Sequence, residues 1–295
     1  MSRLVYFFIY LGMWLLASLP MKALYVLSDV LYVLMYKLAR YRRRVVWRNL
    51  KNSFPEKTEK ELLAIERKFY HYICDYMLES LKMLKMPVDE LHQRMKFHNT
   101  EQYLEMIDKY GGIVVMMPHY ANFEWTIGMG MYMKPEDIPM QVYKTLRNPY
   151  VDKLFQNIRS RFGGYNVPKH DTAREVIRAR HAGKKLALGL VADQSPNLQS
   201  LHFWTTFLNQ ETSFMDGGER IARMMNYPVF YCELQKEKRG YCEATFVLMT
   251  EHPKQTADGE ITEMFVRHVE QTILREPAYW FWSHKRWKHK RKIEE

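Results

Sequence analysis

Cysteine, glycine and proline are scarce in this chain of 295 residues, which contains 3, 13 and 12 of them. The cysteines form no C-x-x-C pair and are odd in number, so we expect no disulfide framework and favour a reducing compartment. Few glycines and prolines, with 47% hydrophobic and 26% charged residues, exclude the disordered and fibrous classes. The length suffices for one large domain or two small ones.

Several catalytic motifs are also absent. The sequence has no G-x-S-x-G for a serine nucleophile and no H-E-x-x-H for a zinc site. No third histidine, cysteine or acid stands at metal-ligand spacing near the candidate site described below, so we expect neither a metal nor another cofactor. We find no internal repeat, low-complexity segment or clean linker, which favours one globular domain.

Acidic residues are missing from two basic stretches. Residues 37–51 contain seven Lys or Arg and residues 285–292 contain six, with no Asp or Glu in either. The formal net charge is +11, so these stretches account for the whole surplus. A near-neutral body with two basic patches is not the pattern of a protein that coats nucleic acid, and we expect no nucleic-acid partner.

A long apolar run lies near the N-terminus. Residues 4–21 lack charge and would form a helix of roughly 27 Å, enough to cross a hydrocarbon core. Residues 23–36 form a shorter run with one acid and are predicted to lie at the interface or pack on the body. The basic residues at 37–51 then place the body in the cytoplasm. We predict a membrane anchor in residues 1–36 and one domain in 37–295; the alternative is a cleaved signal peptide.

The two basic stretches have separate predicted partners. The stretch at 37–51, beside the apolar run, is expected at the anionic membrane surface, with Tyr41 and Trp47 as interfacial aromatics. The stretch at 285–292 follows three tryptophans. It is expected to bind an acidic carrier protein or an acidic lipid, or to be a solvated tail.

The rest of the chain alternates apolar runs with amphipathic helical patterns. Helices are predicted at 56–86, 100–109, 122–132, 148–161, 171–182, 216–226 and 259–275. Strands are predicted at Ile113–Met117, Met140–Tyr143, Leu186–Ala192, Val229–Leu234 and Tyr241–Met249. This alternation predicts an α/β fold with a largely parallel sheet flanked by helices.

The most informative passage surrounds His119. The buried strand Ile113–Met117 runs into Pro118 and His119, which places the imidazole at the carboxyl end of a central strand, where α/β sheets bind their ligands. Glu124 follows five residues later, in the first turn of a predicted helix. Its carboxylate could hold Nδ1–H of His119 and leave Nε2 as a general base. The alternative is a loop histidine and a glutamate that merely favours the helix N-terminus.

Five ordered motifs resemble the lysophospholipid acyltransferase superfamily and, within it, the bacterial lipid A lauroyl and myristoyl transferases. They cover roughly residues 100–290. They read HYANFE at 119–124, VYKTLRNPYVDKLFQNIRSRFGG at 142–164, GLVADQSP at 189–196, FLNQETSFMDGGERIAR at 207–223 and REPAYWFWSHKRWK at 275–288.

The resemblance implies acyl transfer from an acyl-thioester on acyl carrier protein to a hydroxyl of a membrane glycolipid. In this reading His119 is the general base and Glu124 its partner, in an enzyme of the bacterial inner membrane that faces the cytoplasm. Arg147 and Arg161 would contact an anionic head group or donor phosphate. Asp193 would hold Arg161 or a sugar hydroxyl, or cap its loop.

The sequence does not assign a single role to several other residues. Arg159 is expected on a solvated helix face, and Arg223 either near the site or on the surface. The aromatics Phe203, Trp204, Phe207 and Phe214 predict an apolar tunnel, a membrane-facing loop or ordinary core packing. Two other functions remain possible: the same chemistry on a lysophospholipid, amino lipid or other glycolipid, and a non-catalytic lipid-binding protein at the membrane surface.

Overall fold

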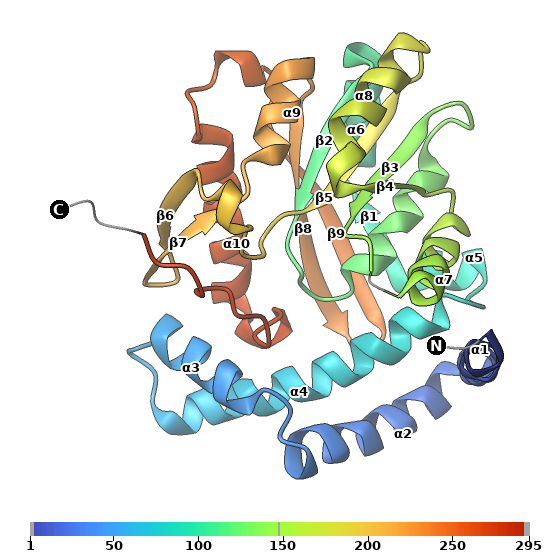
Figure 1. Cartoon of the computed structure of the whole chain (residues 1–295), viewed down its shortest axis with the longest axis vertical. Helices are drawn as coiled ribbons and strands as arrows, with labels where there is room; N and C mark the ends of the chain where they lie inside the picture. Colours follow the sequence, from blue (N-terminus) through green and yellow to red (C-terminus); the bar gives the residue numbers. More distant parts are fainter. Residues whose placement is uncertain (1–2, 147, 292–295) are drawn as a thin grey trace.

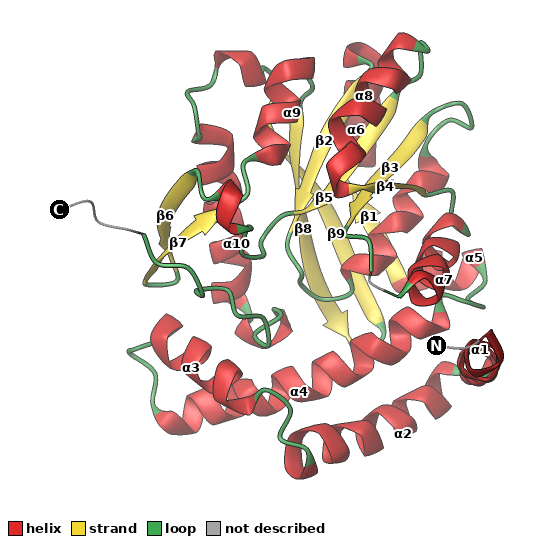
Figure 2. Cartoon of the chain, viewed as in Figure 1, coloured by secondary structure: helices red, strands yellow, loops and turns green. Residues whose placement is uncertain are grey.

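The computed structural model describes residues 3–146 and 148–291 (Figure 1). Its centre is a seven-stranded sheet in the order β1-β9-β8-β2-β5-β3-β4, flanked by helices (Figure 2). The strands are β1 (Met95–His98), β2 (Gly112–Met117), β3 (Ile138–Tyr143), β4 (Tyr165–Pro168), β5 (Leu186–Val191), β8 (Val229–Lys238) and β9 (Tyr241–Thr250).

Most neighbouring strands are parallel, as predicted. β8, β2, β5, β3 and β4 run in one direction, whereas β9 turns back from β8 as a hairpin and pairs in parallel with β1. All five predicted strands are present, which confirms the α/β fold. The prediction missed β1, β4 and a separate hairpin of β6 (Phe203–Phe207) and β7 (Gln210–Phe214). Strands of four or five residues with mixed polarity carry little periodic signal.

In the described part of the body, eight α-helices cover or border the sheet. They are α3 (Arg43–Ser53), α4 (Glu59–Lys82), α5 (Val88–Arg94), α6 (Thr100–Tyr110), α7 (Pro149–Ser160), α8 (Thr172–His181), α9 (Gly217–Met225) and α10 (Glu260–Arg275). A capping box of Thr58 and Glu61 begins the long helix α4. The helix predicted at 122–132 forms instead a 3-10 helix, η2 (Phe123–Tyr132). Two glycines and β-branched residues make that segment a poor α-helix former.

The segment predicted as a spanning helix over residues 4–21, with a shorter interfacial or packed helix over 23–36, forms a bent pair of helices. α1 (Arg3–Ser18) ends before Pro20, and α2 (Met21–Tyr32) continues into a π-helix, η1 (Val33–Leu38). Among the described residues no single helix is long and apolar enough to cross a membrane, but a pair passes by length and composition: Tyr6–Ser18 with Met21–Leu38, bent by 120°. α2 lies along α4, on the side of α4 away from the sheet (Figure 1).

This segment exposes many apolar side chains on its outer surface. They are Phe7, Phe8, Ile9, Leu11, Trp14, Leu15, Leu16, Val26, Leu27, Val30, Val33, Leu34 and Leu38. Their inner neighbours Leu24, Tyr32 and Tyr36 are buried against the body. So many exposed apolar side chains in one segment are typical of a protein that contacts another protein or a membrane.

The two basic stretches meet in space. On α3, the Asn49 amide donates to the carbonyls of Trp282 and His284, both at 2.9 Å. Arg42 donates to the carbonyl of Ser283 at 3.0 Å. Residues far apart in the chain therefore form one basic surface, and the C-terminal stretch is not a solvated tail up to residue 291. Arg286 in particular is fully buried and donates to Thr212 and Ser213.

Candidate active site

The candidate site lies where two adjacent parallel strands end. β2 and β5 are neighbours, and Met117 at the end of β2 is paired with Val191 at the end of β5. His119 and Asp193 each lie two residues further along their own chain segments. The sheet register therefore brings these two side chains face to face, beyond the carboxyl edge of the sheet.

Asp193 holds both the ring and the backbone of His119. Its Oδ1 lies 2.5 Å from His119 Nδ1, and its Oδ2 accepts the His119 backbone N–H at 2.9 Å. Trp280 Nε1–H donates to the same Oδ2 at 2.6 Å. The Asp193 side chain is 1% exposed and that of His119 17%. A carboxylate held by three donors orients the imidazole and keeps Nδ1 protonated.

The second ring nitrogen of His119 faces outward. Nε2 lies 3.1 Å from the Gln194 amide nitrogen. With Nδ1–H bound to Asp193, Nε2 is unprotonated, and its one lone pair accepts a hydrogen bond from the Gln194 amide. This is the tautomer that a general base requires.

Asp193 is ionised at neutral pH. Burial by itself raises its pKa, but the charge of His119 and the hydrogen bonds from His119 and Trp280 outweigh burial and lower the pKa below its usual value of 3.8. His284 lies close by and is neutral, because burial lowers its pKa to about 4. Its Nε2 accepts the Ser195 backbone N–H at 3.2 Å.

We expected Glu124 to contact the imidazole of His119, but it pairs with Arg159 instead. Its carboxylate forms a bidentate ion pair with Arg159: Arg159 Nε donates to Oε2 at 3.0 Å, and Nη2 donates to Oε1 at 2.7 Å. Asp193 takes the place that we expected for Glu124, because the sheet register, which sequence spacing does not reveal, sets the partner of His119. The expectation of a solvated Arg159 was also wrong: the side chains of Glu124 and Arg159 are only 11% and 19% exposed. Glu124 raises the pKa of Arg159 against the effect of burial, which lowers it.

The other predicted arginines lie elsewhere. Arg161 donates to the carbonyls of Met83 and Met86 and lines neither cavity described below. Arg147 lies outside the described residues. Arg223 is a surface residue that pairs with Asp258 at 3.0 Å.

Two cavities adjoin the site. The larger, about 530 Å³, is lined by His119, Gln194 and His284 among others. The smaller, about 100 Å³, lies between the sheet and η2; its apolar lining includes Val115, Met117, Ile127, Met129, Met140 and Val191. The Glu124–Arg159 pair lines both cavities. Phe207 and Phe214, which predicted a tunnel or core packing, are fully buried core residues and line neither.

The mouth of the larger cavity is basic. Lys144, Lys169 and Lys288 line it, and no acidic group lies within 4.0 Å of their amines in the described part of the chain. Burial and the neighbouring Lys144 lower the pKa of Lys169. Lys288 also lines a second basic hollow of about 530 Å³, together with Arg48, Lys285 and Lys290. Through Lys288 the joined basic surface reaches the mouth of the candidate site.

Sequence reasoning missed three residues of the site. Gln194 and Trp280 stood in motifs that we had noted without a role, and Arg159 was taken as solvated. One signal could have found the central pair: His119 and Asp193 both follow predicted strands closely. Had those strands been placed side by side, the two residues would have been expected opposite each other.

Comparison with known proteins identifies the family of the chain. The family model for bacterial lipid A biosynthesis acyltransferase matches residues 1–289. The chain is 24% identical to the lipid A biosynthesis lauroyltransferase of Escherichia coli (strain K12) over 279 residues, which cover 94% of this chain and 89% of that protein. It is 27% identical to a lipid A biosynthesis acyltransferase of Haemophilus influenzae over 164 residues, about half of either chain.

The family model covers nearly the whole length of the chain. The chain therefore belongs to the bacterial lipid A biosynthesis acyltransferases.

Proposed function

We propose that this protein transfers a fatty acyl chain from an acyl-thioester of acyl carrier protein to a hydroxyl of a lipid A precursor, with His119 as general base. The observation that carries this proposal is the tautomer of His119. Asp193 binds Nδ1–H, so Nε2 is unprotonated, and His119 lines the larger cavity, where an acceptor hydroxyl would replace the Gln194 amide as the donor to Nε2.

The reaction balances without a covalent enzyme intermediate. His119 Nε2 takes the proton of the acceptor hydroxyl as its oxygen forms a bond to the thioester carbonyl carbon. Asp193 stabilises the imidazolium that results. The carbon–sulfur bond then breaks, and the leaving thiolate receives the proton from His119. A thioester is already activated, so the proposed step uses no metal or other cofactor.

The Glu124–Arg159 pair is proposed to stabilise the oxyanion. Its guanidinium lines the cavity that holds the Nε2 of His119, and it also borders the apolar cavity. Negative charge develops on the carbonyl oxygen during attack, and a fixed cation in a partly dry site lowers that barrier. Glu124 acts in this scheme by holding Arg159 with two hydrogen bonds.

The smaller cavity is proposed to receive the acyl chain. Its lining is mainly apolar, and it lies next to the proposed oxyanion site, where the first carbons of the chain would enter. Gly189 of β5 lines this cavity. A Cβ built on Gly189 would be in ordinary contact with the Met140 carbonyl oxygen at 3.6 Å and with Met117 Cε at 3.9 Å, so a side chain at this position would lie beside two other residues of the cavity lining.

The charged and apolar surfaces of the protein support the proposed substrates and the proposed location. The lysines at the mouth of the larger cavity suit an anionic acceptor, and the joined basic surface suits an acidic carrier protein. The exposed apolar residues of α1, α2 and η1 suit the hydrocarbon region of the inner membrane, and the basic stretch at 37–51 suits its anionic surface, with the body on the cytoplasmic side. We do not propose Arg161 as a substrate contact, because its guanidinium donates to the backbone carbonyls of Met83 and Met86.

The first prediction concerns the reaction itself. Purified protein should transfer acyl chains from acyl carrier protein to a lipid A precursor, as measured by mass spectrometry of the product. His119→Ala should lower the rate by about 10²- to 10⁴-fold. His181→Ala, at an exposed histidine of α8, is the control and should keep the wild-type rate. Full activity of His119→Ala would refute the mechanism; activity confined to another acceptor, or none at all, would refute the substrate or the enzymatic function.

The second prediction concerns Asp193. Asp193→Asn removes the charge that stabilises the imidazolium, so kcat should fall by about 10²-fold or more, with a smaller change in KM. Because the folded state lowers the pKa of Asp193, its ionised form stabilises the fold above about pH 5, and this contribution is lost as the pH falls through the folded pKa.

Denaturant unfolding checks that sign. The free energy of unfolding should be lower for Asp193→Asn than for the wild type from about pH 5 to 8, and the difference should shrink below about pH 4. A difference that stays constant down to about pH 3 would contradict an ionised Asp193 in the folded state.

The third prediction concerns chain length. Gly189→Val should place methyl groups in the smaller cavity and lower kcat/KM for the longest accepted acyl donor by about tenfold or more. Shorter donors should change by no more than about threefold. Gly189→Ala is the matched control. An equal loss for all donor lengths would mean that the chain binds elsewhere.

The fourth prediction concerns the carrier protein. The double variant Arg48→Glu, Lys285→Glu reverses two charges of the basic hollow and should raise KM for the carrier-protein thioester by about tenfold at low salt. KM for the coenzyme A thioester should change little, because that donor has no protein surface. Lys184→Glu with Lys254→Glu, both exposed and remote from the hollow, is the control. A parallel rise with both donors would rule out docking of the carrier protein on this surface.

A further inference from the structure

The loop that carries His119 contains a backbone conformation that needs support. Ala121 has φ of 47°, in the left-handed region that a residue with a Cβ rarely adopts. Its backbone N–H donates to the Tyr279 carbonyl at 3.0 Å. Its carbonyl accepts the hydroxyl of Tyr72 at 2.8 Å. Contacts from outside the loop therefore hold Ala121 on both sides, two residues after His119.

Asn122 is held just as firmly. It is 1% exposed, and its amide nitrogen donates to Glu79 Oε2 at 2.9 Å. Its amide oxygen has no partner in the described structure, so Glu79 alone orients this side chain. Glu79 is 2% exposed, and its other oxygen accepts the hydroxyl of Tyr25 at 3.0 Å. Tyr72 and Glu79 lie on one helix, α4, so that helix holds two successive residues of the loop.

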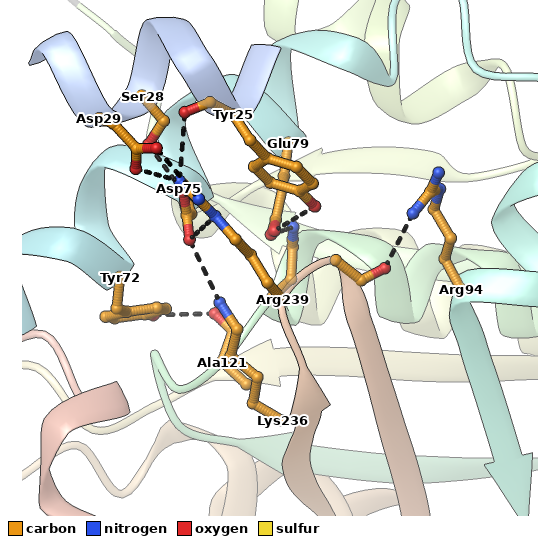
Figure 3. A network of polar contacts seen from close by, with 12 residues as sticks. Tyr25, Ser28, Asp29, Tyr72, Asp75, Glu79, Arg94, Ala121, Lys236 and Arg239 are labelled. Carbon is orange, nitrogen blue, oxygen red and sulfur yellow. Dashed lines mark hydrogen bonds and ion pairs between the residues drawn. The ribbon is translucent and has the colours of Figure 1, made fainter. Parts of the chain in front are cut away.

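Tyr25 belongs to α2, in the segment with the exposed apolar surface. An ion network ties α2 to the body at the same place (Figure 3). Arg239, in the turn of the β8–β9 hairpin, pairs with Asp29 of α2 at 2.6 Å and with Asp75 of α4 at 2.7 Å. Ser28 of α2 also donates to Asp75 at 2.7 Å. These contacts fix α2 along α4 and so present the Tyr25 hydroxyl to Glu79.

We propose that Tyr72 and Glu79 are positioning residues for the reaction, which hold the loop of His119, and that α2 contributes to this through Tyr25. Neither side chain lines a cavity of the site, so each acts on the reaction through the loop. This inference rests on the proposed function of His119. If the inference holds, the orientation of His119 Nε2 depends on how α2 packs on α4.

The physical reason is the cost of an unpartnered group. Without the Tyr72 hydroxyl, the Ala121 carbonyl loses its buried donor, and the strained φ is no longer compensated. Without the Glu79 carboxylate, the Asn122 amide has no partner. In either case the loop relaxes and displaces His119 from the geometry in which it faces its substrate. Small displacements of a catalytic group have large effects on rate.

α4 offers matched controls. Tyr70 is also buried and donates its hydroxyl to a backbone carbonyl, that of Tyr41, which is outside the site. Glu66 is likewise a buried carboxylate that accepts the hydroxyl of a tyrosine, Tyr36, from the N-terminal segment. Tyr70→Phe therefore removes a comparable hydrogen bond from the same helix without touching the loop. Glu66→Gln also removes the charge that pairs with Arg43 at 3.0 Å, so it is the more severe change, likewise outside the loop.

The fifth prediction compares these variants. Tyr72→Phe and Glu79→Gln should lower kcat for acyl transfer by about 10- to 100-fold, with KM changing less, whereas Tyr70→Phe and Glu66→Gln should stay within about twofold. Tyr25→Phe should give a smaller loss of the same kind. It also serves as the test if Glu79→Gln does not fold. Losses in kcat that are equal in the test and control variants, or absent in both, would overturn the proposal.

A second readout separates positioning from general stability. Ala121→Gly makes the left-handed conformation favourable without help, so Tyr72→Phe should cost less activity in that background than in the wild type. Hydrogen exchange of the peptide that contains residues 118–123 should be faster in Tyr72→Phe and Glu79→Gln, but not in the controls. Unchanged exchange would refute the positioning role whatever reaction the protein catalyses, whereas an active His119→Ala would refute only the proposed function.

Discussion

The structure of the site depends on one buried carboxylate. Asp193 accepts three hydrogen bonds, from the ring and backbone of His119 and from the indole of Trp280. Two of its donors belong to His119, beyond the end of the neighbouring strand β2, and the third comes from the C-terminal segment, whereas Asp193 itself follows β5. A buried charge must be matched by donors, since it is otherwise very costly to remove from water. That requirement holds the strand ends and the C-terminal segment together.

The same constraint recurs along α4. This helix lies between the sheet and α2 and carries Glu66, Asp75 and Glu79, all buried. Each of these carboxylates accepts a hydrogen bond from the N-terminal segment: Glu66 from Tyr36, Asp75 from Ser28 and Glu79 from Tyr25. Each also accepts one from another part of the chain. α4 therefore connects the exposed apolar N-terminal segment to the loop that carries His119.

Much of the fold was predictable because its pattern is local. Central strands read as unbroken apolar runs, and amphipathic helices as apolar residues at helical spacing, so all five predicted strands and most helices were placed well. The edge strands β1 and β4 are short and partly polar, and the bend after α1 depends on packing against α4. The 3-10 form of η2 depends on the glycines of that segment and on its contacts. Neighbours distant in sequence contribute to each of these features, in addition to local residues such as Pro20 and the glycines of η2.

The candidate site divides in the same way. The sequence by itself determined that His119 ends a central strand, that Glu124 and Asp193 lie in motifs beside strand ends, and that the positive charge gathers in two stretches. Only the tertiary structure decided the pairs: His119 with Asp193, Glu124 with Arg159, and the two basic stretches with each other. A sequence pattern specifies on which face and at which end of an element a residue lies. The partner of that residue depends on which strands are adjacent and in what register, and this results from packing of the whole chain.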